Sequence, residues 1–71
     1  MNRLTTLQEA DAIQARSRGR AARVSVSNGN RSPVINPYSQ HSFHAYCWQA
    51  GYSMDMRNVT ELHRDWLAVK V

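Results

Sequence analysis

Three residues of types that bind metals or act as nucleophiles lie close together in the sequence, namely His41, His44 and Cys47, with His63 further along. Zinc takes nitrogen and sulfur ligands in a tetrahedral arrangement, so this group is a candidate metal site. Positions i and i+3 of a helix share a face, but positions i and i+6 lie about 240° apart, so Cys47 would approach the metal from the wrong side. We therefore expect two exposed histidines and a buried thiol, with no metal bound.

The same residues contain the pair that a Cys–His nucleophile requires. Their spacing supplies neither a third group to orient the histidine nor an oxyanion site. The three glycines, Gly19, Gly29 and Gly51, are scattered and form no phosphate-binding loop. We expect no catalytic residues, no enzymatic activity and no cofactor.

The arginines are distributed unevenly along the chain, and their distribution indicates what the chain binds. Residues 1–35 carry six arginines against two carboxylates, a net charge of +4, whereas residues 36–71 carry three basic and three acidic residues and are neutral. The planar guanidinium fork suits phosphate groups. Arg16, Arg20 and Arg23 follow a spacing that projects three guanidinium groups from one side of a helix. They repel one another unless an anion lies across them, which indicates a polyanionic partner, although a solvated helix face would carry the same charges.

The length of 71 residues allows one small domain, which buries only a modest core. Its single cysteine excludes an internal disulfide and favours a reducing cytoplasm. No apolar run approaches the roughly 20 residues of a membrane span, and no signal-peptide core follows Met1. We therefore expect a cytoplasmic location without a membrane role.

Hydrophobic periodicity predicts an all-α fold, a small domain of two to three helices over residues 1–71, with a flexible polar connector between the first and second helix. The first helix is expected at about 7–24, with a capping box at either Thr5 and Gln8 or Thr6 and Glu9. Gly19 is its weak point. Its predicted apolar side consists of Leu7, Ala10, Ile13, Ala21 and Val24.

The connector is expected at 25–37, with a turn at Asn28-Gly29. The sequence around 24–27 alternates like a strand and could pair with residues 34–35. An isolated hairpin is marginally stable, so a linker is the expectation.

The second helix is expected at about 39–52, capped by Asn36 or Ser39. A glycine inside it, Gly51, indicates either the close approach of another backbone or the end of the helix. Among the aromatic residues Phe43, Trp48 and Trp66 are expected in the core, and Tyr38 and Tyr46 are the candidates for exposed base stacking. The apolar residues of the second helix form two adjacent stripes. One stripe consists of Phe43, Cys47, Ala50 and Met54, and the other of Ala45, Trp48 and Tyr52.

The third helix is expected at about 59–69. Asn58 and Glu61 have capping-box spacing at its start. It should close over the middle helix as a packing element, with its polar residues facing away. Its predicted packing side consists of Val59, Leu62, Trp66 and either Val69 or Leu67.

Three motifs in this order resemble those of the ribosome modulation factor family and its small bacterial and phage relatives. They are Arg18-Gly19, Asn36-Pro37-Tyr38 and Trp48-Gln49-Ala50-Gly51-Tyr52. The resemblance covers roughly residues 14–56 and implies a two-helix core that contacts ribosomal RNA and holds ribosomes in an inactive state. The chain departs from the family in three ways. Its connector is longer, a glycine-rich repeat in the first helix is largely lost (Ala22 and Val24 stand where small residues are usual), and residues 57–71 have no counterpart.

The residues and the resemblance lead to two hypotheses. The first is an RNA- or ribosome-binding protein that modulates translation. Its nucleic-acid-binding residues would be phosphate-contacting arginines and a recognition turn: Arg16, Arg18, Arg20, Arg23 and Arg31, with Asn36, Pro37 and Tyr38. The second is a protein-interaction module, either a phage-encoded inhibitor of a host protein or a homodimer, because the middle helix and the added third helix offer more apolar surface than a two-helix unit needs.

Overall fold

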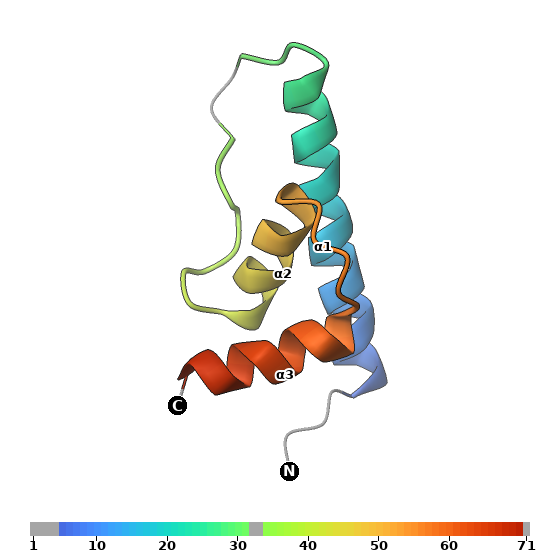
Figure 1. Cartoon of the computed structure of the whole chain (residues 1–71), viewed down its shortest axis with the longest axis vertical. Helices are drawn as coiled ribbons and strands as arrows, with labels where there is room; N and C mark the ends of the chain where they lie inside the picture. Colours follow the sequence, from blue (N-terminus) through green and yellow to red (C-terminus); the bar gives the residue numbers. More distant parts are fainter. Residues whose placement is uncertain (1–4, 32–33, 71) are drawn as a thin grey trace.

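The computed structural model describes residues 5–31 and 34–70, except for the side chain of Lys70. These residues form three helices, α1 (Thr6–Ser27), α2 (Phe43–Tyr52) and α3 (Val59–Lys70), and no strand (Figure 1). The predicted all-α fold is confirmed. No helix within the described ranges is long and apolar enough to cross a membrane.

The first helix begins at the first of the two predicted capping boxes. The Thr5 hydroxyl accepts a hydrogen bond from the Gln8 backbone nitrogen (3.1 Å), and the Gln8 side-chain oxygen accepts one from the Thr5 backbone nitrogen (2.9 Å). These two bonds satisfy amide groups that a helix N-terminus otherwise leaves without partners.

The end of α1 was predicted too early. The helix continues through residues 24–27 to Ser27, so the connector spans 28–42 and no hairpin forms in the described residues. The Asn30 side chain donates a hydrogen bond to the Ser25 hydroxyl (2.9 Å), which holds the last turn. Gly29 then takes a positive φ of 96° and ends the helix, as glycine commonly does. The stop signal is therefore Gly29, at the predicted turn.

The second helix starts later than predicted, at Phe43. Its cap is Ser42, whose hydroxyl accepts a hydrogen bond from the Ala45 backbone nitrogen (3.1 Å). Residues 39–42 form a turn in which the Ser42 nitrogen bonds the Ser39 carbonyl oxygen (3.1 Å) and His41 adopts a positive φ of 71°. That left-handed residue cannot continue a helix, which explains why neither Asn36 nor Ser39 is the cap.

The core depends on small residues where α1 crosses α2. Ala12, Ala15 and Gly19 form the buried strip of α1, and Cys47 and Gly51 belong to the buried side of α2. Small residues four positions apart on each helix let the two helix backbones approach closely. Gly19 is therefore a packing contact within a continuous helix. Of the two alternatives for Gly51, the close approach of another backbone is confirmed.

The apolar side predicted for α1 is wrong. Leu7, Ile13 and Val24 are 79%, 52% and 45% exposed, and Ala10 and Ala21 are exposed as well. The buried strip lies on the other side of the helix because alanine and glycine there admit the α2 backbone, which branched side chains would hold away.

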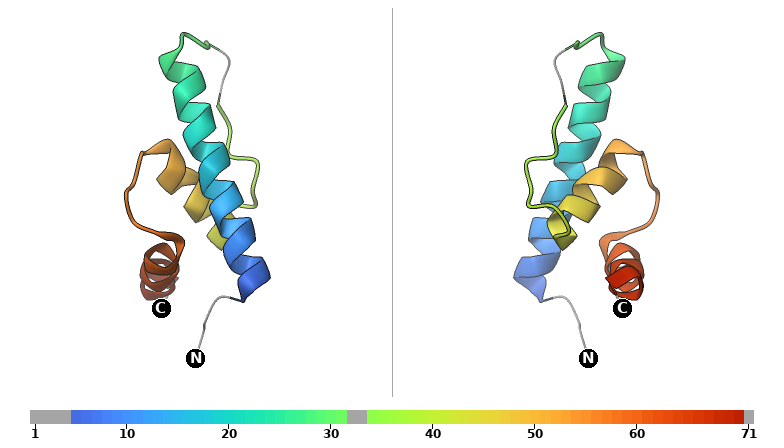
Figure 2. Two further views of the ribbon diagram at one scale, coloured as in Figure 1. Left: turned by 90° about the vertical axis from the view of Figure 1, so that its right-hand side faces the viewer. Right: turned by 90° about the vertical axis from the view of Figure 1, so that its left-hand side faces the viewer.

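The third helix lies across the N-terminal half of α1 and the start of α2 (Figures 1 and 2). Its predicted cap is confirmed, with Asn58 and Glu61 exchanging hydrogen bonds of 2.9 and 3.2 Å. Val59 and Leu62 are buried in the core, whereas Val69 is 75% exposed.

The aromatic residues are less deeply buried than predicted. Trp48 is buried, but Phe43 and Trp66 are half-buried, with their ring centroids 5.4 Å apart between α2 and α3. Met54, predicted to extend the α2 stripe, lies beyond the end of the helix and is 43% exposed. The core therefore stays small.

Candidate nucleic-acid interface

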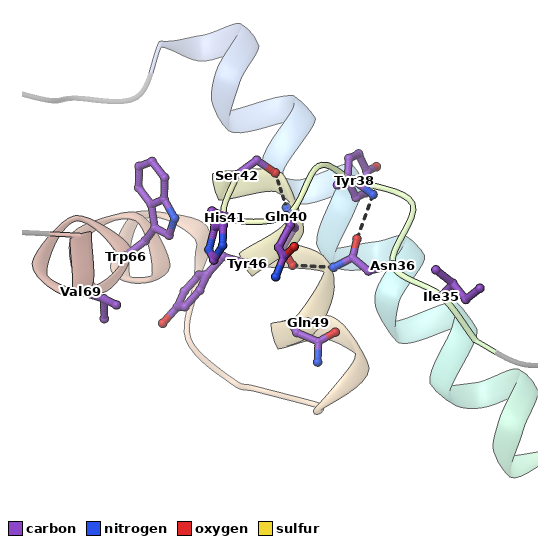
Figure 3. A pocket seen from close by; sticks show the side chains of 11 residues that line it. Ile35, Asn36, Tyr38, Gln40, His41, Ser42, Tyr46, Gln49, Trp66 and Val69 are labelled. Atoms are coloured by element: carbon purple, nitrogen blue, oxygen red, sulfur yellow. Dashed lines mark hydrogen bonds between the residues drawn. The ribbon is translucent and has the colours of Figure 1, made fainter.

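Asn36 fixes the position of the predicted recognition turn. Its side-chain nitrogen donates a hydrogen bond to the Ala45 carbonyl oxygen (2.9 Å), and its side-chain oxygen accepts one from the Tyr38 backbone nitrogen (3.0 Å; Figure 3). Asn36 is half-buried, while Pro37 is exposed. The turn is therefore anchored to the start of α2 and presents Pro37 to solvent.

Tyr38 connects this turn to both helices of the core. Its ring stacks on His44, with centroids 5.7 Å apart and planes inclined by 23°. Its hydroxyl accepts a hydrogen bond from Nη1 of Arg18 (3.2 Å), an exposed residue of α1. With Asp11 and Gln14 these residues line a hollow of about 250 Å³. The turn and the basic helix therefore meet at Tyr38 and Arg18.

The other predicted arginines differ in whether their side chains already contact other residues of the fold. Arg16 is half-buried and donates from Nη2 to the Asp55 carbonyl oxygen (3.5 Å), and Arg23 lies 5.6 Å from the centroid of the Tyr52 ring. Arg20 and Arg31 are exposed, and their side chains form no ion pair or hydrogen bond with the residues described. Arg20 and Arg31 are thus the arginines most available to a partner.

The predicted site residues do not form one patch. Gly19 lies at the contact with α2. Viewed down the axis of α1, Arg18 lies about 100° to one side of Gly19 and Arg20 about 100° to the other side. Arg16 and Arg23 fall on the same side as Arg20. The structure therefore brings the recognition turn to Arg18, while the predicted arginine row lies on the opposite flank of α2.

The cysteine and the histidines are separated by the fold. Cys47 is buried, and desolvation raises the pKa of its thiol to about 11, a rise that nearby Arg16 partly offsets. At neutral pH the group is a protonated thiol, which is a poor nucleophile and a poor metal ligand. His44 stacks on Tyr38, and the His63 ring contacts Phe43 at 4.9 Å. Within the described residues no three His, Cys, Asp or Glu side chains form a group that could hold a metal ion.

A larger groove, which sequence reasoning missed, opens on the outer side of α2 (Figure 3). Its volume is about 750 Å³, and it runs between the connector, α2 and the end of α3. No signal in the sequence places the connector beside α3, so the groove was not predictable. Its side chains include Ile35, Gln40, His41, Tyr46, Gln49, Trp66 and Val69.

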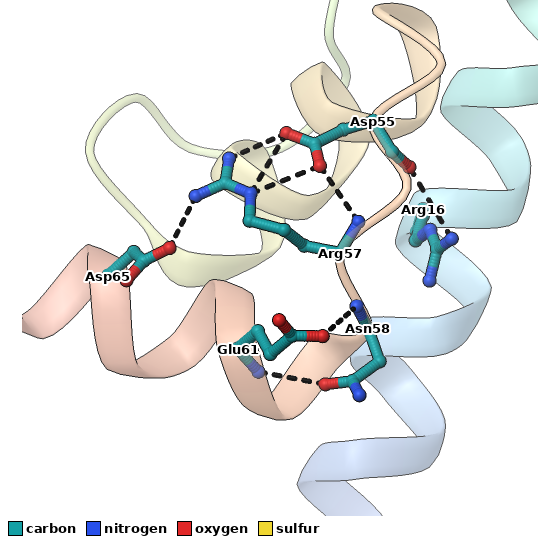
Figure 4. A network of polar contacts seen from close by, with 6 residues as sticks. All are labelled: Arg16, Asp55, Arg57, Asn58, Glu61 and Asp65. Atoms are coloured by element: carbon teal, nitrogen blue, oxygen red, sulfur yellow. Dashed lines mark hydrogen bonds and ion pairs between the residues drawn. The ribbon is translucent and has the colours of Figure 1, made fainter.

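An ion-pair network, also unpredicted, joins the α2–α3 connector to α3 (Figure 4). Arg57 donates from Nη2 to Asp55 (2.6 Å) and from Nη1 to Asp65 (2.5 Å), and its guanidinium lies 5.9 Å from the centroid of the Tyr46 ring. These hydrogen bonds lower the pKa of Asp55 to about 2 and raise that of Arg57. Arg57 is therefore a structural residue, and Tyr46 is partly covered.

No family model, curated protein or solved structure matches this chain. The likeness to ribosome modulation factor accordingly rests on the three sequence motifs alone. What the structure adds is their arrangement: the Asn36-Pro37-Tyr38 turn meets the Arg18-Gly19 motif directly, through the hydrogen bond between Tyr38 and Arg18.

Proposed function

We propose that this chain is a small RNA- or ribosome-binding protein of the ribosome modulation factor type that acts on translation in the cytoplasm. The observation that carries the proposal is the hydrogen bond between Arg18 and Tyr38. It holds an exposed guanidinium group beside a fixed, solvent-facing turn, and both belong to motifs of the resemblance.

The arginines of α1 and the connector supply the affinity for phosphate in this proposal. Arg18, Arg20, Arg23 and Arg31 are exposed, and each can neutralise a backbone phosphate. The ring under Arg23 is compatible with this role, because a stacked guanidinium keeps its in-plane N–H donors. Arg16 adds positive charge to this surface, but its guanidinium group donates a hydrogen bond to the Asp55 carbonyl oxygen.

The turn supplies the point of contact. Pro37 is its exposed residue, whereas Asn36 and Tyr38 act mainly by positioning it. Because the Tyr38 ring is stacked on His44, its part is to orient Arg18 rather than to stack on a base. We therefore propose that the turn recognises the shape of a folded RNA surface, with phosphates on both flanks of α2.

Co-sedimentation with ribosomes over a range of salt concentrations tests this function. Binding that depends on phosphate contacts weakens as salt rises, and each lost contact lowers the slope of log K against log salt by about 0.7–0.9. Arg20→Gln and Arg31→Gln should each reduce both the affinity and the slope. Neither change removes a hydrogen bond within the described fold.

Arg64→Gln is the matched control, since Arg64 is also exposed but lies on α3, outside the resemblance. Ribosome binding that kept its affinity and salt slope in the Arg20→Gln, Arg31→Gln double variant would contradict the proposal. An equal effect of Arg64→Gln would show that only net charge matters, and would contradict a defined site.

A second candidate function, the docking of a host protein, is favoured by the groove on α2. Ile35 and Val69, two of its lining residues, are 78% and 75% exposed, and they leave apolar surface at the groove that a protein partner could cover. Affinity capture with and without nuclease distinguishes the candidates. A partner that survives nuclease and is lost in Val69→Asp supports protein docking, whereas a partner released by nuclease supports RNA binding.

A further inference from the structure

The side of α1 that faces away from α2 is an apolar surface that the fold leaves uncovered. Leu7, Ile13 and Val24 are 79%, 52% and 45% exposed. Nothing else in the described chain lies across this side, as the view onto α1 shows (Figure 2, left). We call it the outer face of α1; it consists of Leu7, Ala10, Ile13, Ser17, Ala21 and Val24, with the exposed polar residue Gln14 at its edge beside Leu7.

The spacing of the outer face suits contact with another helix. Its residues follow one another at intervals of three and four, which keeps them on one side over five turns. Small residues at Ala10, Ser17 and Ala21 allow close approach of a second backbone, and the larger Leu7, Ile13 and Val24 supply apolar area. Both features are those of a helix–helix seam.

The charges beside the outer face determine which helix fits. Both acids of α1, Glu9 and Asp11, lie near its N-terminal end, and its arginines follow from the middle of the helix onward: Arg16, Arg18, Arg20 and Arg23. A parallel copy of α1 would set like charges side by side. An antiparallel copy sets the acidic half of each helix against the basic half of the other, and also opposes the two helix dipoles favourably.

We propose that two copies of this chain pair antiparallel through the outer faces of their α1 helices, with Ala10 of each opposite Ala21 of the other. In that register Leu7 packs beside Val24 of the second copy, and Glu9 comes within reach of Arg20 and Arg23. Ion pairs at the exposed rim set the orientation, while the apolar seam supplies the affinity. An RNA would leave the seam uncovered and would be repelled by Glu9 and Asp11.

The oligomeric state at different protein concentrations tests the pairing, by sedimentation equilibrium on the full chain. We expect a monomer–dimer equilibrium that Ile13→Lys shifts toward monomer, with a dissociation constant at least about tenfold higher, because it places a charge in the seam. Ile35→Lys is the matched control: the same change at an exposed isoleucine that lines the groove on α2 and does not belong to the outer face of α1. Helical circular dichroism should be unchanged in both, since neither residue belongs to the core.

Cysteine crosslinking tests the direction of the pairing. The native Cys47 is buried and hardly reacts, so an added cysteine reports alone. Ala10→Cys and Ala21→Cys chains, distinguished by mass and mixed, should crosslink to each other through a short bis-maleimide far more than each to itself. Arg64→Cys on α3 gives the level of random collision.

Four outcomes would overturn the proposal. They are a wild-type chain that stays monomeric at high concentration, a dimer that Ile35→Lys dissociates and Ile13→Lys does not, crosslinking of each variant mainly to itself, and crosslinking no greater than that of Arg64→Cys. None of these measurements involves RNA, so failure of the dimer leaves the ribosome-binding proposal to its own test.

Discussion

Gly19 and Gly51 each occupy the point where the backbone of the other helix comes closest. A Cβ on Gly19 would lie 1.9 Å from the Trp48 carbonyl oxygen, and a Cβ on Gly51 would lie 1.9 Å from the Arg16 carbonyl oxygen. Real Cβ atoms do not come so near to backbone atoms. The two glycines therefore fix how closely α1 and α2 pack.

The first prediction concerns these glycines. In an exposed helix, changing glycine to alanine stabilises by about 1 kcal/mol. At Gly19 and Gly51 we expect the opposite sign, because either change forces the helices apart, and a loss of about 2–3 kcal/mol in the free energy of unfolding is typical of such overpacking. Urea unfolding followed by circular dichroism measures it.

Ser17→Ala, at an exposed position of the same helix, is the control and should be neutral or slightly stabilising. If the Gly19→Ala chain were as stable as the wild type, the close crossing of α1 and α2 would be wrong.

Helix propensity and capping predicted the elements of this fold, but not which side of α1 faces inward. The periodicity of larger apolar residues indicated the side with Leu7, Ile13 and Val24, whereas the core uses a strip of alanine and glycine. Hydrophobicity gives such small residues little weight, although their lack of bulk is what brings the helices together. Gly51 was recognised because glycine is unfavourable inside a helix and needs a reason.

The candidate site was predictable as a set of residues but not as an arrangement. The arginine spacing showed that Arg16, Arg20 and Arg23 share a side of α1. The position of Tyr38 depends on the path of the connector, which is set by a hydrogen bond between Asn36 and the Ala45 carbonyl. That bond joins residues nine apart across a turn, and no local sequence pattern predicts it.

The second prediction concerns Asn36. Asn36→Ala removes the side-chain hydrogen bond to the Ala45 carbonyl oxygen and leaves the Tyr38 nitrogen without its partner, in a half-buried place. The expected loss is about 1–3 kcal/mol of unfolding free energy. Ribosome binding should weaken as well, because the turn would no longer be held beside Arg18. Gln40→Ala, at an exposed residue of the same connector, is the control; equal effects of both changes would contradict an anchoring role for Asn36.

The third prediction concerns pH. Hydrogen bonds from the Arg57 side chain, and next from its backbone, lower the pKa of Asp55 from its usual 3.8 to about 2. A carboxyl group whose pKa is lower in the folded state stabilises the fold at pH values above its unfolded pKa, and this contribution is lost as pH falls from about 4 to about 2. The urea midpoint of the wild type should therefore exceed that of Asp55→Asn at pH 7, and the difference should shrink toward pH 2.

Asp11→Asn removes one carboxylate from α1, away from Arg57, and serves as the control for net charge. A gap between wild type and Asp55→Asn that stayed constant from pH 7 to pH 2 would show that the ion pair with Arg57 does not act on stability.

The fourth prediction concerns the end of α2. The Asp55 nitrogen bonds the Ala50 carbonyl oxygen (2.9 Å) and the Met54 nitrogen bonds the Gly51 carbonyl oxygen (3.1 Å), which is the Schellman arrangement, with Met54 at a φ of 57° in the place that glycine prefers. A left-handed conformation costs a residue with a side chain about 1–2 kcal/mol. Met54→Gly removes that strain and loses little packing, since Met54 is 43% exposed.

After the greater flexibility of glycine in the unfolded chain is subtracted, we expect Met54→Gly to stabilise the protein by about 0.5–1 kcal/mol. Ser53→Gly, one residue earlier at a φ of −83°, relieves no strain and should destabilise by about the same amount. Thermal unfolding of the two variants therefore separates strain from flexibility. A lower melting temperature for both would show that Met54 is not strained, and that its side chain contributes more to the packing of α2 than its exposure indicates.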